Sequence, residues 1–480
     1  MQDSLRELFF WRSAPVTESL TAEPEQLDGK LRVADTERPI ELDLAGRILR
    51  LYPEFPIDPA HAAPRDWRLV DVERCFREVC GFATIRPGES LLVGRDNERL
   101  HQLFGFTSAI RNRHLEIEND AGRLTFRRLD PDAETVVSQI DEPSEVARPL
   151  VNRRNNLQRV RSIFGGLIEL LSPEPALAAL RQVNQILGDE EYRVKDASGR
   201  PGGLVNLPGE LLPIIVGDLH AQVDNLLKIL SEDSYLEALC RGEACLILLG
   251  DNIHSEVDGE LEQMDTSLLM LDLIFKLKIR FPDHVVCLRG NHESFEADVG
   301  KDGVPQGILF RKRVRELRGQ SYADELETFF GLLPYVVKSS DFIACHGGPP
   351  RGGAALQDLI GIADHPDLAH ALTWNRLKGP RAPLGYRKKD VKRFRAMLGA
   401  EKKTPLIVAH NPLSQEETVW TDAGEITNHH IVFSAHQDRL ALFTRIGEHL
   451  LPLEYPAESL LAFANALELS VADAVPSAAM

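Results

Sequence analysis

Apolar and polar positions divide this 480-residue chain into stretches with different periods. From Trp67 to Val137, apolar and polar residues alternate and are interrupted by Pro-Gly and Asn-Asp turn signals, which predicts a small β domain. The stretch before residue 67 is rich in proline and contains only two candidates for short strands, Lys30–Val33 and Ile48–Tyr52. The strands expected within the β domain are Ser90–Val93, His114–Ile117 and Leu124–Arg127.

The next stretch, residues 138–210, changes to a helical period. Ser172 and Pro173 supply an N-cap and a first-turn proline, after which leucine and valine recur at helical spacing up to Leu187. A basic, amide-rich segment at 152–161 predicts a solvated helix face, with contact to a phosphate as the alternative. Ser198–Gly203 has the composition of a loop.

After Glu210 one pattern recurs five times: a short apolar run, typical of a buried strand, ends directly in polar residues. Because ligand-binding groups in open α/β sheets lie beyond the carboxyl ends of the strands, five converging ends predict a cation site. Helical patterns lie between the runs, for example at Leu268–Ile279, and indicate a layered α/β domain. The runs are Leu212–Val216, Leu246–Leu249, Val285–Leu288, Phe342–Cys345 and Leu406–Ala409.

These changes of pattern predict five parts. They are a segment at 1–66 whose order the pattern does not fix, a β domain at 67–145, a helical connector at 146–205, a catalytic domain at 206–460 and a tail at 461–480.

Composition narrows the class of protein. With 43% hydrophobic and 27% charged residues the chain is typical of a globular protein, and no stretch has the roughly 20 apolar residues of a spanning helix. Six scattered cysteines predict buried, reduced thiols, and without a signal-peptide core we expect a cytoplasmic protein with no membrane partner. The net charge of −18 disfavours nucleic acid as a partner.

The residues at the strand ends indicate which cations are expected. Aspartate, histidine and asparagine supply oxygen and imidazole donors suited to Mn, Fe or Zn, divalent or trivalent, and no thiolate cage accompanies them. A carboxylate shared by two such ions about 3.5–4 Å apart supports in-line attack of a bridging hydroxide on phosphorus. The pattern therefore predicts a two-metal phosphoesterase.

The order of these motifs resembles the phosphoprotein phosphatase (PPP-type, calcineurin-like metallophosphoesterase) family over about residues 210–450. The resemblance implies an α/β fold in which a sandwich of two sheets is flanked by helices. The matching strings are Gly217-Asp218-Leu219-His220, Gly250-Asp251-Asn252, Arg289-Gly290-Asn291-His292-Glu293, Cys345-His346-Gly347-Gly348 and Ala409-His410-Asn411.

Carried onto these positions, the resemblance implies a role for each site residue. Asp218 and His220 would bind one metal, and Asp251 would bridge to the second. His292 would be the general acid, while Arg289 and Arg381 would face the substrate phosphate. The remaining ligands of the second metal would be Asn291, His346 and His410.

The second motif departs from the family. It normally ends Asp-Arg-Gly, in which the aspartate orients the catalytic histidine and the arginine clamps phosphate, but here it is His254-Ser255-Glu256. A serine cannot replace a bidentate guanidinium, so substrate choice or rate is expected to differ. For His254 three interpretations stay open: a neutral hydrogen-bond partner of His292, an additional metal contact, and simple space filling.

The β domain resembles a forkhead-associated (FHA) domain, an all-β fold that binds phosphothreonine peptides. The resemblance rests on Gly94-Arg95, on the strand His114–Ile117 and on Gly122-Arg123. The phosphate-binding serine expected three residues before His114 is Arg111. Arg95 and Arg111 are therefore the candidate phosphopeptide ligands, and a β domain that only packs is the alternative.

Three functions remain open at this point. The first is a serine/threonine phosphoprotein phosphatase acting on a phosphorylated protein or peptide. The second is a hydrolase of small phosphorylated metabolites or nucleotides, which the absence of an arginine at 255 favours. The third is a phospho-binding regulatory scaffold with weak or no activity.

Overall fold

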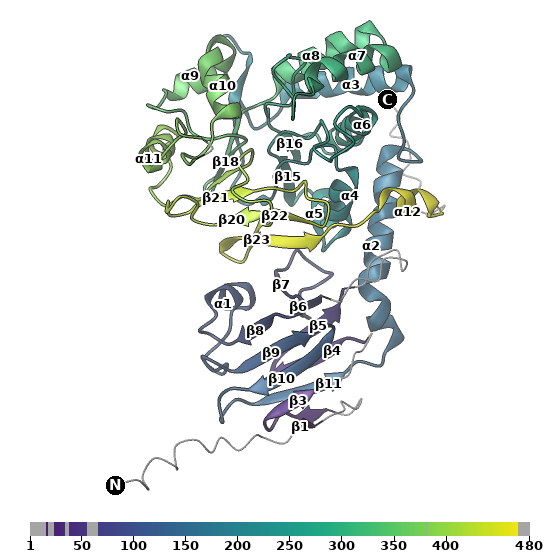
Figure 1. Ribbon diagram of the computed structural model, residues 1–480, viewed down its shortest axis with the longest axis vertical. Coiled ribbons are helices and arrows are strands. Elements are labelled where there is room, and N and C mark those ends of the chain that lie inside the picture. The colour runs from purple at the N-terminus through teal and green to yellow at the C-terminus, as the bar shows by residue number, and fades with distance from the viewer. Residues whose placement is uncertain (1–15, 18–23, 34–37, 55–65, 381, 469–480) are drawn as a thin grey trace. The chain divides into compact units, whose positions relative to one another are not determined.

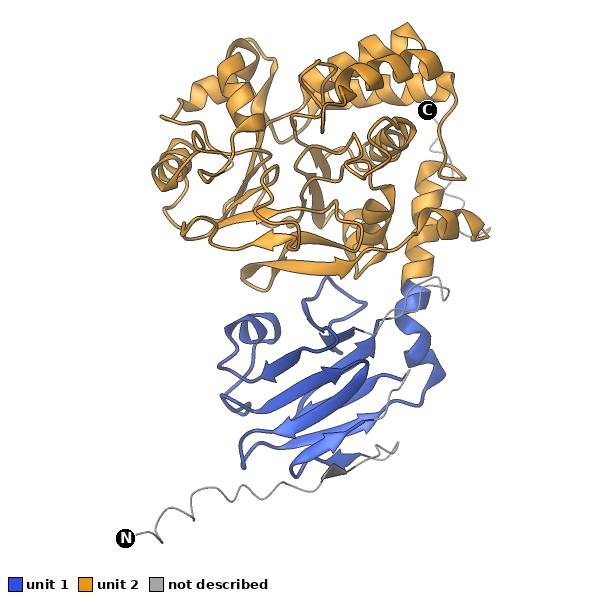
Figure 2. Ribbon diagram, in the orientation of Figure 1, with its two compact units in different colours: residues 1–152 blue, residues 153–480 orange. Residues whose placement is uncertain are grey.

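The computed structural model describes residues 16–17, 24–33, 38–54, 66–380 and 382–468 (Figure 1). The chain divides into two compact units, residues 1–152 and 153–480 (Figure 2). Within the described ranges, no helix is both long enough and apolar enough to span a bilayer.

The first unit is built from two β-sheets. One has the strand order β1-β3-β10-β9-β8 and the other has the order β2-β11-β4-β5-β6-β7. Helix α1 spans Glu98–Phe104. The strands are β1 (Val16–Thr17), β2 (Glu25–Gln26), β3 (Lys30–Arg32), β4 (Ile40–Leu44), β5 (Arg47–Pro53), β6 (Trp67–Asp71), β7 (Phe82–Ile85), β8 (Ser90–Val93), β9 (Leu115–Asp120), β10 (Arg123–Arg128) and β11 (Thr135–Gln139).

Strands from the proline-rich segment complete both sheets of this unit. β3 pairs antiparallel with β10, and β5 pairs antiparallel with β6, so the boundary expected at residues 66 and 67 falls inside the unit. Burial explains the pairing: Ile40, Leu42 and Leu44 alternate along β4 and are fully buried. The two strands expected in this segment are confirmed, within β3 and β5.

The second unit contains a seven-stranded and a five-stranded sheet. Their orders are β12-β13-β17-β18-β19-β21-β20 and β16-β15-β14-β22-β23. The strands are β12 (Arg193–Lys195), β13 (Pro201–Asn206), β14 (Leu212–Val216), β15 (Ala244–Leu248), β16 (Val285–Cys287), β17 (Val336–Lys338), β18 (Ile343–Cys345), β19 (Leu406–Val408), β20 (Val419–Trp420), β21 (His429–Val432), β22 (Arg439–Ile446) and β23 (His449–Pro456).

The two sheets of the second unit share one apolar core. Alternate residues of each strand enter it, such as Ile215 and Ile247 from one sheet and Val337 and Ile407 from the other. The residues between them, such as Val336 and Val408, pack on the outer face of the seven-stranded sheet with side chains of α9 to α11. The predicted α/β sandwich is therefore confirmed.

Helices flank both sheets of this unit (Figure 1). Helix α3 carries the helical signal predicted after Ser172, with Leu180, Val183 and Leu187 buried. The helices are α2 (Pro143–Phe164), which begins in the first unit, α3 (Pro173–Asp189), α4 (Val223–Ser231), α5 (Tyr235–Cys240), α6 (Asp265–Arg280), α7 (Gln306–Arg318), α8 (Gln320–Leu332), α9 (Leu356–Ile360), α10 (Pro366–Trp374), α11 (Lys388–Met397) and α12 (Leu461–Ala466).

Three expectations about this unit need correction. The basic segment of α2 is solvated only in part: Arg154 and Arg159 are exposed, but Arg153 and Arg161 are buried. Arg153 forms ion pairs with Glu232 at 2.9 Å and Glu458 at 2.8 Å. The glycine-rich loop ends at Arg200, since β13 begins at Pro201 and pairs with β17. Of the six free cysteines, Cys240 is exposed and the other five are buried.

Candidate metal centre

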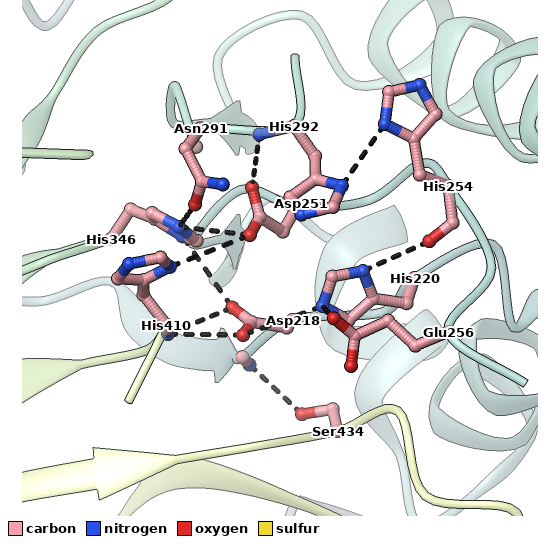
Figure 3. Close-up of polar contacts among 12 residues, drawn as sticks. Asp218, His220, Asp251, His254, Glu256, Asn291, His292, His346, His410 and Ser434 are labelled. Carbon is pink, nitrogen blue, oxygen red and sulfur yellow. Dashed lines mark hydrogen bonds and ion pairs between the residues drawn. The ribbon is translucent and has the colours of Figure 1, made fainter. Parts of the chain in front are cut away.

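The five predicted strand ends meet at one place in the second unit (Figure 3). Strands β14, β15 and β16 run parallel in one sheet, and β18 and β19 run parallel in the other. Their carboxyl ends therefore point the same way within each sheet. The side chains that follow these ends are between 0% and 6% exposed. They are Asp218, His220, Asp251, Asn291, His292, His346 and His410.

Backbone hydrogen bonds tie the first two motifs together. The amides of Leu219 and His220 donate to the carbonyl of Asp251 at 3.1 and 2.8 Å. His220, Asp251 and His410 all adopt a left-handed φ, of 42°, 51° and 56°. Non-glycine residues take this conformation only where the surrounding structure holds them in it, as functional sites often do.

Glycine at position 290 is required by close packing against the central carboxylate. A Cβ atom there would lie 2.3 Å from Oδ1 of Asp251. The absence of a side chain allows the backbone after β16 to reach Asp251, whose Oδ1 accepts from the amide of His292 at 2.7 Å. Glu293 supports the same loop, since its carboxylate accepts from the amides of Asp251 and Asn252 at 2.9 and 2.8 Å.

Two groups of potential ligands overlap at Asp251. Asp218, His220 and Asp251 form one group, and Asp251, His346 and His410 form the other; within each group the ligand atoms lie within 4.8 Å of one another. Oδ2 of Asp251 is 3.2 Å from Nε2 of His346 and 3.9 Å from Nδ1 of His410. Oδ1 of Asn291 lies 3.1 Å from Nε2 of His346 and so joins the second group.

These groups fit metal ions on their donor chemistry and their charge. Among the described residues, Asp218 and Asp251 form ion pairs only with histidines, although both are almost fully buried. A buried carboxylate without a lysine or arginine partner is costly unless a cation compensates it. The donors, carboxylate, amide and imidazole, are those that Mn, Fe and Zn accept.

The electrostatics of the two carboxylates differ. Burial and the neighbouring Asp251 raise the pKa of Asp218 to about 7. Burial also acts to raise the pKa of Asp251, but the imidazoles of His346 and His292 hold it well below its usual value. The pKa values of the two carboxylates are thus shifted in opposite directions, as expected for adjacent buried carboxylates.

His292 pairs with a histidine rather than with a carboxylate. Nδ1 of His254 lies 3.1 Å from Nδ1 of His292, so one ring donates and the other accepts (Figure 3). Burial lowers the pKa of His292 to about 4 and holds the pKa of His254 well below its ordinary value, with His292 contributing. Of the three interpretations of His254, this contact supports the hydrogen-bond partner of His292.

The predicted arginines have different surroundings. Nη1 of Arg289 donates to the carbonyl of Phe330 in α8, which holds the strand end in place. Arg381 lies outside the described residues. Arg376, which the sequence analysis did not single out, is exposed and lies near enough to His410 to contribute to lowering the pKa of that imidazole, after burial.

The position of Arg376 depends on a local loop that no short motif reveals. The amide of Tyr386 donates to the carbonyl of Arg376 at 2.9 Å, and the amide of Lys378 donates to the carbonyl of Tyr386 at 2.9 Å. Across the described residues, the guanidinium of Arg376 forms no hydrogen bond or ion pair. It is therefore free to bind an anion.

A cavity of about 620 Å³ is lined by residues from 350 to 375 and by none of the seven side chains at the strand ends. Trp374 is the link between the cavity and these side chains: it lines the cavity, and its ring meets the ring of His410 edge-on at 6.0 Å. Arg351 and His370 also line the cavity, together with Asp364 and Asp367. Both signs of charge therefore face a ligand in this space.

In the first unit, the two candidate phosphopeptide residues lie on neighbouring loops. The amide of Arg95 donates to the carbonyl of Arg111 at 3.2 Å, and Nε of Arg95 donates to the carbonyl of Ile110 at 2.8 Å. Arg95 is exposed, and Arg111 forms a 3.8 Å ion pair with Asp132. The buried His114 organises the loop, since its Nδ1 accepts from the amide of Arg111 at 3.1 Å.

Comparison with known proteins agrees with this geometry. The sequence model of the calcineurin-like phosphoesterase family matches residues 213–439, which include all seven side chains at the strand ends.

Several similar solved structures are described as phosphatases. A Saccharomyces cerevisiae protein serine/threonine phosphatase, described as similar to human phosphatase PP5, is 17% identical with a TM-score of 0.45, over 60% of this chain and 90% of that one. A cold-active protein tyrosine phosphatase is 14% identical with a TM-score of 0.36, over 52% of this chain and 80% of that one. A cold-active protein-tyrosine phosphatase of a psychrophilic Shewanella species is 13% identical with a TM-score of 0.35, over 53% of this chain and 82% of that one.

At these TM-scores the structural likeness carries no weight in the assignment, which rests on the family match and on the ligand groups. Residues 213–439 match the calcineurin-like phosphoesterase family, and the protein is a metal-dependent phosphoester hydrolase.

Proposed function

We propose that the second unit is a phosphomonoesterase with a dinuclear metal centre that acts on phosphoserine and phosphothreonine in proteins. The observation that carries the proposal is the sharing of Asp251 by two groups of ligands. In this proposal Asp218, His220 and Asp251 hold the first ion. The second ion is held by Asp251, Asn291, His346 and His410.

Two ions of Mn, Fe or Zn held by these ligands would supply an activated water for in-line attack and would stabilise the charge that develops on the phosphoryl group. The chain's own residues do the rest. His292 gives a proton to the leaving oxygen once the negative charge of a bound phosphate raises its pKa above the value of about 4 in the free protein. His254 holds the ring of His292 through the hydrogen bond between their Nδ1 atoms. Arg376 binds a phosphate oxygen, with its backbone held by the contacts to Tyr386.

The cavity beside Trp374 supports a peptide substrate. Its volume of about 620 Å³ accommodates side chains on either side of the phosphorylated residue, and its lining of opposite charges suits a polypeptide. The hydrolysis of small phosphorylated metabolites or nucleotides is the second candidate. One observation favours it: Ser255 is buried and donates to Glu260 at 3.2 Å, so no cation clamps phosphate at that position.

Turnover of a phosphothreonine peptide, a nucleotide and p-nitrophenyl phosphate separates these proposals. We expect Mn²⁺-dependent turnover of the peptide, reduced about 10²- to 10⁴-fold in His292→Ala because general acid catalysis is worth that much. Turnover of the nucleotide alone would assign the metabolite function. Normal metal uptake without turnover of any of the three substrates would favour the regulatory scaffold as the function.

We also propose that the first unit binds a phosphothreonine segment. Its support is the placement of the Arg95 and Arg111 guanidinium groups on loops joined by a backbone hydrogen bond. A binding unit on the same chain would raise the effective concentration of a phosphorylated partner at the hydrolase site.

A further inference from the structure

Glu256 lies beside the metal centre without belonging to either ligand group. It stands where the phosphatase motif has glycine, after His254 and Ser255, and it is half-buried. Its Oε1 is 3.6 Å from Nε2 of His220. In Figure 3 its carboxylate faces the ring of His220, next to Asp218.

The carboxylate of Glu256 is held in this orientation from its other side. Nζ of Lys301 lies 3.0 Å from Oε2 of Glu256 and 3.2 Å from its backbone carbonyl. Lys301 therefore neutralises one carboxylate oxygen and leaves the other, Oε1, directed at His220.

His220, Glu256 and His292 form a third group whose ligand atoms lie within 4.8 Å of one another. His220 is thus common to this group and to the group with Asp218 and Asp251. Its Nδ1 is occupied, since it lies 3.1 Å from the backbone carbonyl of His254, to which a neutral ring donates. Only Nε2 remains as a ligand atom.

One imidazole nitrogen has one lone pair and binds one ion. Nε2 of His220 lies 3.9 Å from Oδ2 of Asp218 and 3.6 Å from Oε1 of Glu256. An ion bound to this nitrogen is therefore approached by both carboxylates. A separate third ion would need a second lone pair, which the ring does not have.

We propose that Glu256 is an additional ligand of the first metal ion, through Oε1. This inference rests on the proposed dinuclear centre and concerns a residue that the phosphatase motif does not provide. The first ion then has three carboxylates and one imidazole, while the second has one carboxylate, one amide and two imidazoles. Because carboxylates suit harder ions, the first position favours Mn²⁺ over Zn²⁺ relative to the second.

Calorimetric titration of the metal-free protein with Mn²⁺ tests the proposal. The variants are Glu256→Gln, which keeps the shape and removes the charge, and the control Glu260→Gln on the same loop, which contacts Ser255 instead. We expect Glu260→Gln to bind two ions, each with the same affinity as in the wild-type protein. Glu256→Gln should weaken one of the two sites by at least about tenfold, the loss typical even of outer partners of a metal site.

The visible absorption of the Co²⁺-loaded proteins gives a second measurement, since it reports the number and kind of ligands. Unchanged Mn²⁺ affinity and an unchanged Co²⁺ spectrum in Glu256→Gln would overturn the proposal. Three ions in the wild type, one of them lost in Glu256→Gln, would overturn it in favour of a separate third site. A single ion in the wild type, still weakened by Glu256→Gln, would uphold the ligand and overturn the dinuclear centre.

Discussion

The polar side chains of the metal centre are buried, whereas those of the arginine loops in the first unit are more exposed. At the metal centre the donors are between 0% and 6% exposed and follow the ends of five strands. In the first unit Arg95 is exposed, and its Nε donates to the carbonyl of Ile110. A buried polar group is costly without a partner, so the packing around it indicates that it has a function. An exposed guanidinium is solvated by water, so its surroundings do not indicate whether it binds a ligand.

The largest effect expected at the buried site comes from Asp251→Asn. The substitution keeps the shape and one acceptor for the amide of His292 but removes the charge that both ligand groups share. We expect turnover to fall by about 10³-fold or more, because the metal contribution is worth several kcal/mol. Steady-state kinetics with Mn²⁺ measures it.

Asp258→Asn is the matched control, since this exposed carboxylate lies on the same loop outside the ligand groups. Turnover within tenfold of the wild type in Asp251→Asn would remove the basis for treating the buried site as a metal centre, and the contrast with the first unit would disappear.

A second prediction concerns stability and uses a buried histidine away from the ligands. His429 is fully buried between the hydroxyl of Tyr386, 3.0 Å from its Nε2, and the carbonyl of Ala423. Burial lowers its pKa from 6.5 to about 4. Between these two pH values the unfolded chain binds more protons than the folded one, so the free energy of unfolding rises with pH.

The contribution of His429 amounts to about 3 kcal/mol at most, present in full above pH 6.5 and lost as pH falls to 4. Denaturant unfolding of the wild type and of His429→Gln, both with chelator present, should show a steeper pH dependence in the wild type. Parallel curves would mean that burial at this position does not control the proton.

Gly348 provides a third prediction, on how closely the buried site is packed. A Cβ atom at this position would lie 1.9 Å from the ring of Tyr386, which is fully buried and cannot move aside. We expect Gly348→Ala to lower the free energy of unfolding by about 1–3 kcal/mol through overpacking.

Gly331→Ala is the control, because this glycine lies in α8 with nothing within 4 Å of a Cβ atom. It should be neutral or stabilising by up to about 1 kcal/mol, since alanine favours helix. Equal melting temperatures for the two variants would show that the ring of Tyr386 moves to make room for the added methyl group.

The difference between the two regions also explains what the sequence could predict. The convergence of these side chains was predictable because each comes soon after the end of an apolar run, as Asp218 comes two residues after β14 and His410 two residues after β19. A strand end places the next side chain with little freedom, so the local string carries the geometry. The α/β sandwich was also predictable, because the same apolar runs alternate with helical patterns along the chain.

Residues whose position depends on distant parts of the chain were not predictable. Glu256 has the appearance of a surface acid until Lys301 and His220 are placed beside it. Arg153 was expected in solvent because its partners Glu232 and Glu458 are remote in sequence. Arg376 depends on a loop closed by Tyr386. Before residue 67, β4 was not predicted, because it is recognisable only from its pairing with β5 and β11.

The smallest expected effect belongs to the exposed arginines. Arg95→Ala should weaken binding of a phosphothreonine peptide by about tenfold, the loss of one charge-assisted hydrogen bond to phosphate. The free energy of unfolding should change by less than about 0.5 kcal/mol, because the side chain is exposed. Fluorescence anisotropy with a labelled peptide measures the first quantity and denaturant unfolding the second.

Arg113→Ala is the matched control for this variant, since Arg113 is exposed and lies close to Arg111 in sequence. If Arg95→Ala and Arg113→Ala weaken peptide binding equally, the effect is the general attraction between positive charge and phosphate, which salt screens. If only Arg95→Ala does so, and the unphosphorylated peptide does not bind, the loops of the first unit form a specific site. That result would show that Arg95 has a function although nothing in its packing indicates one.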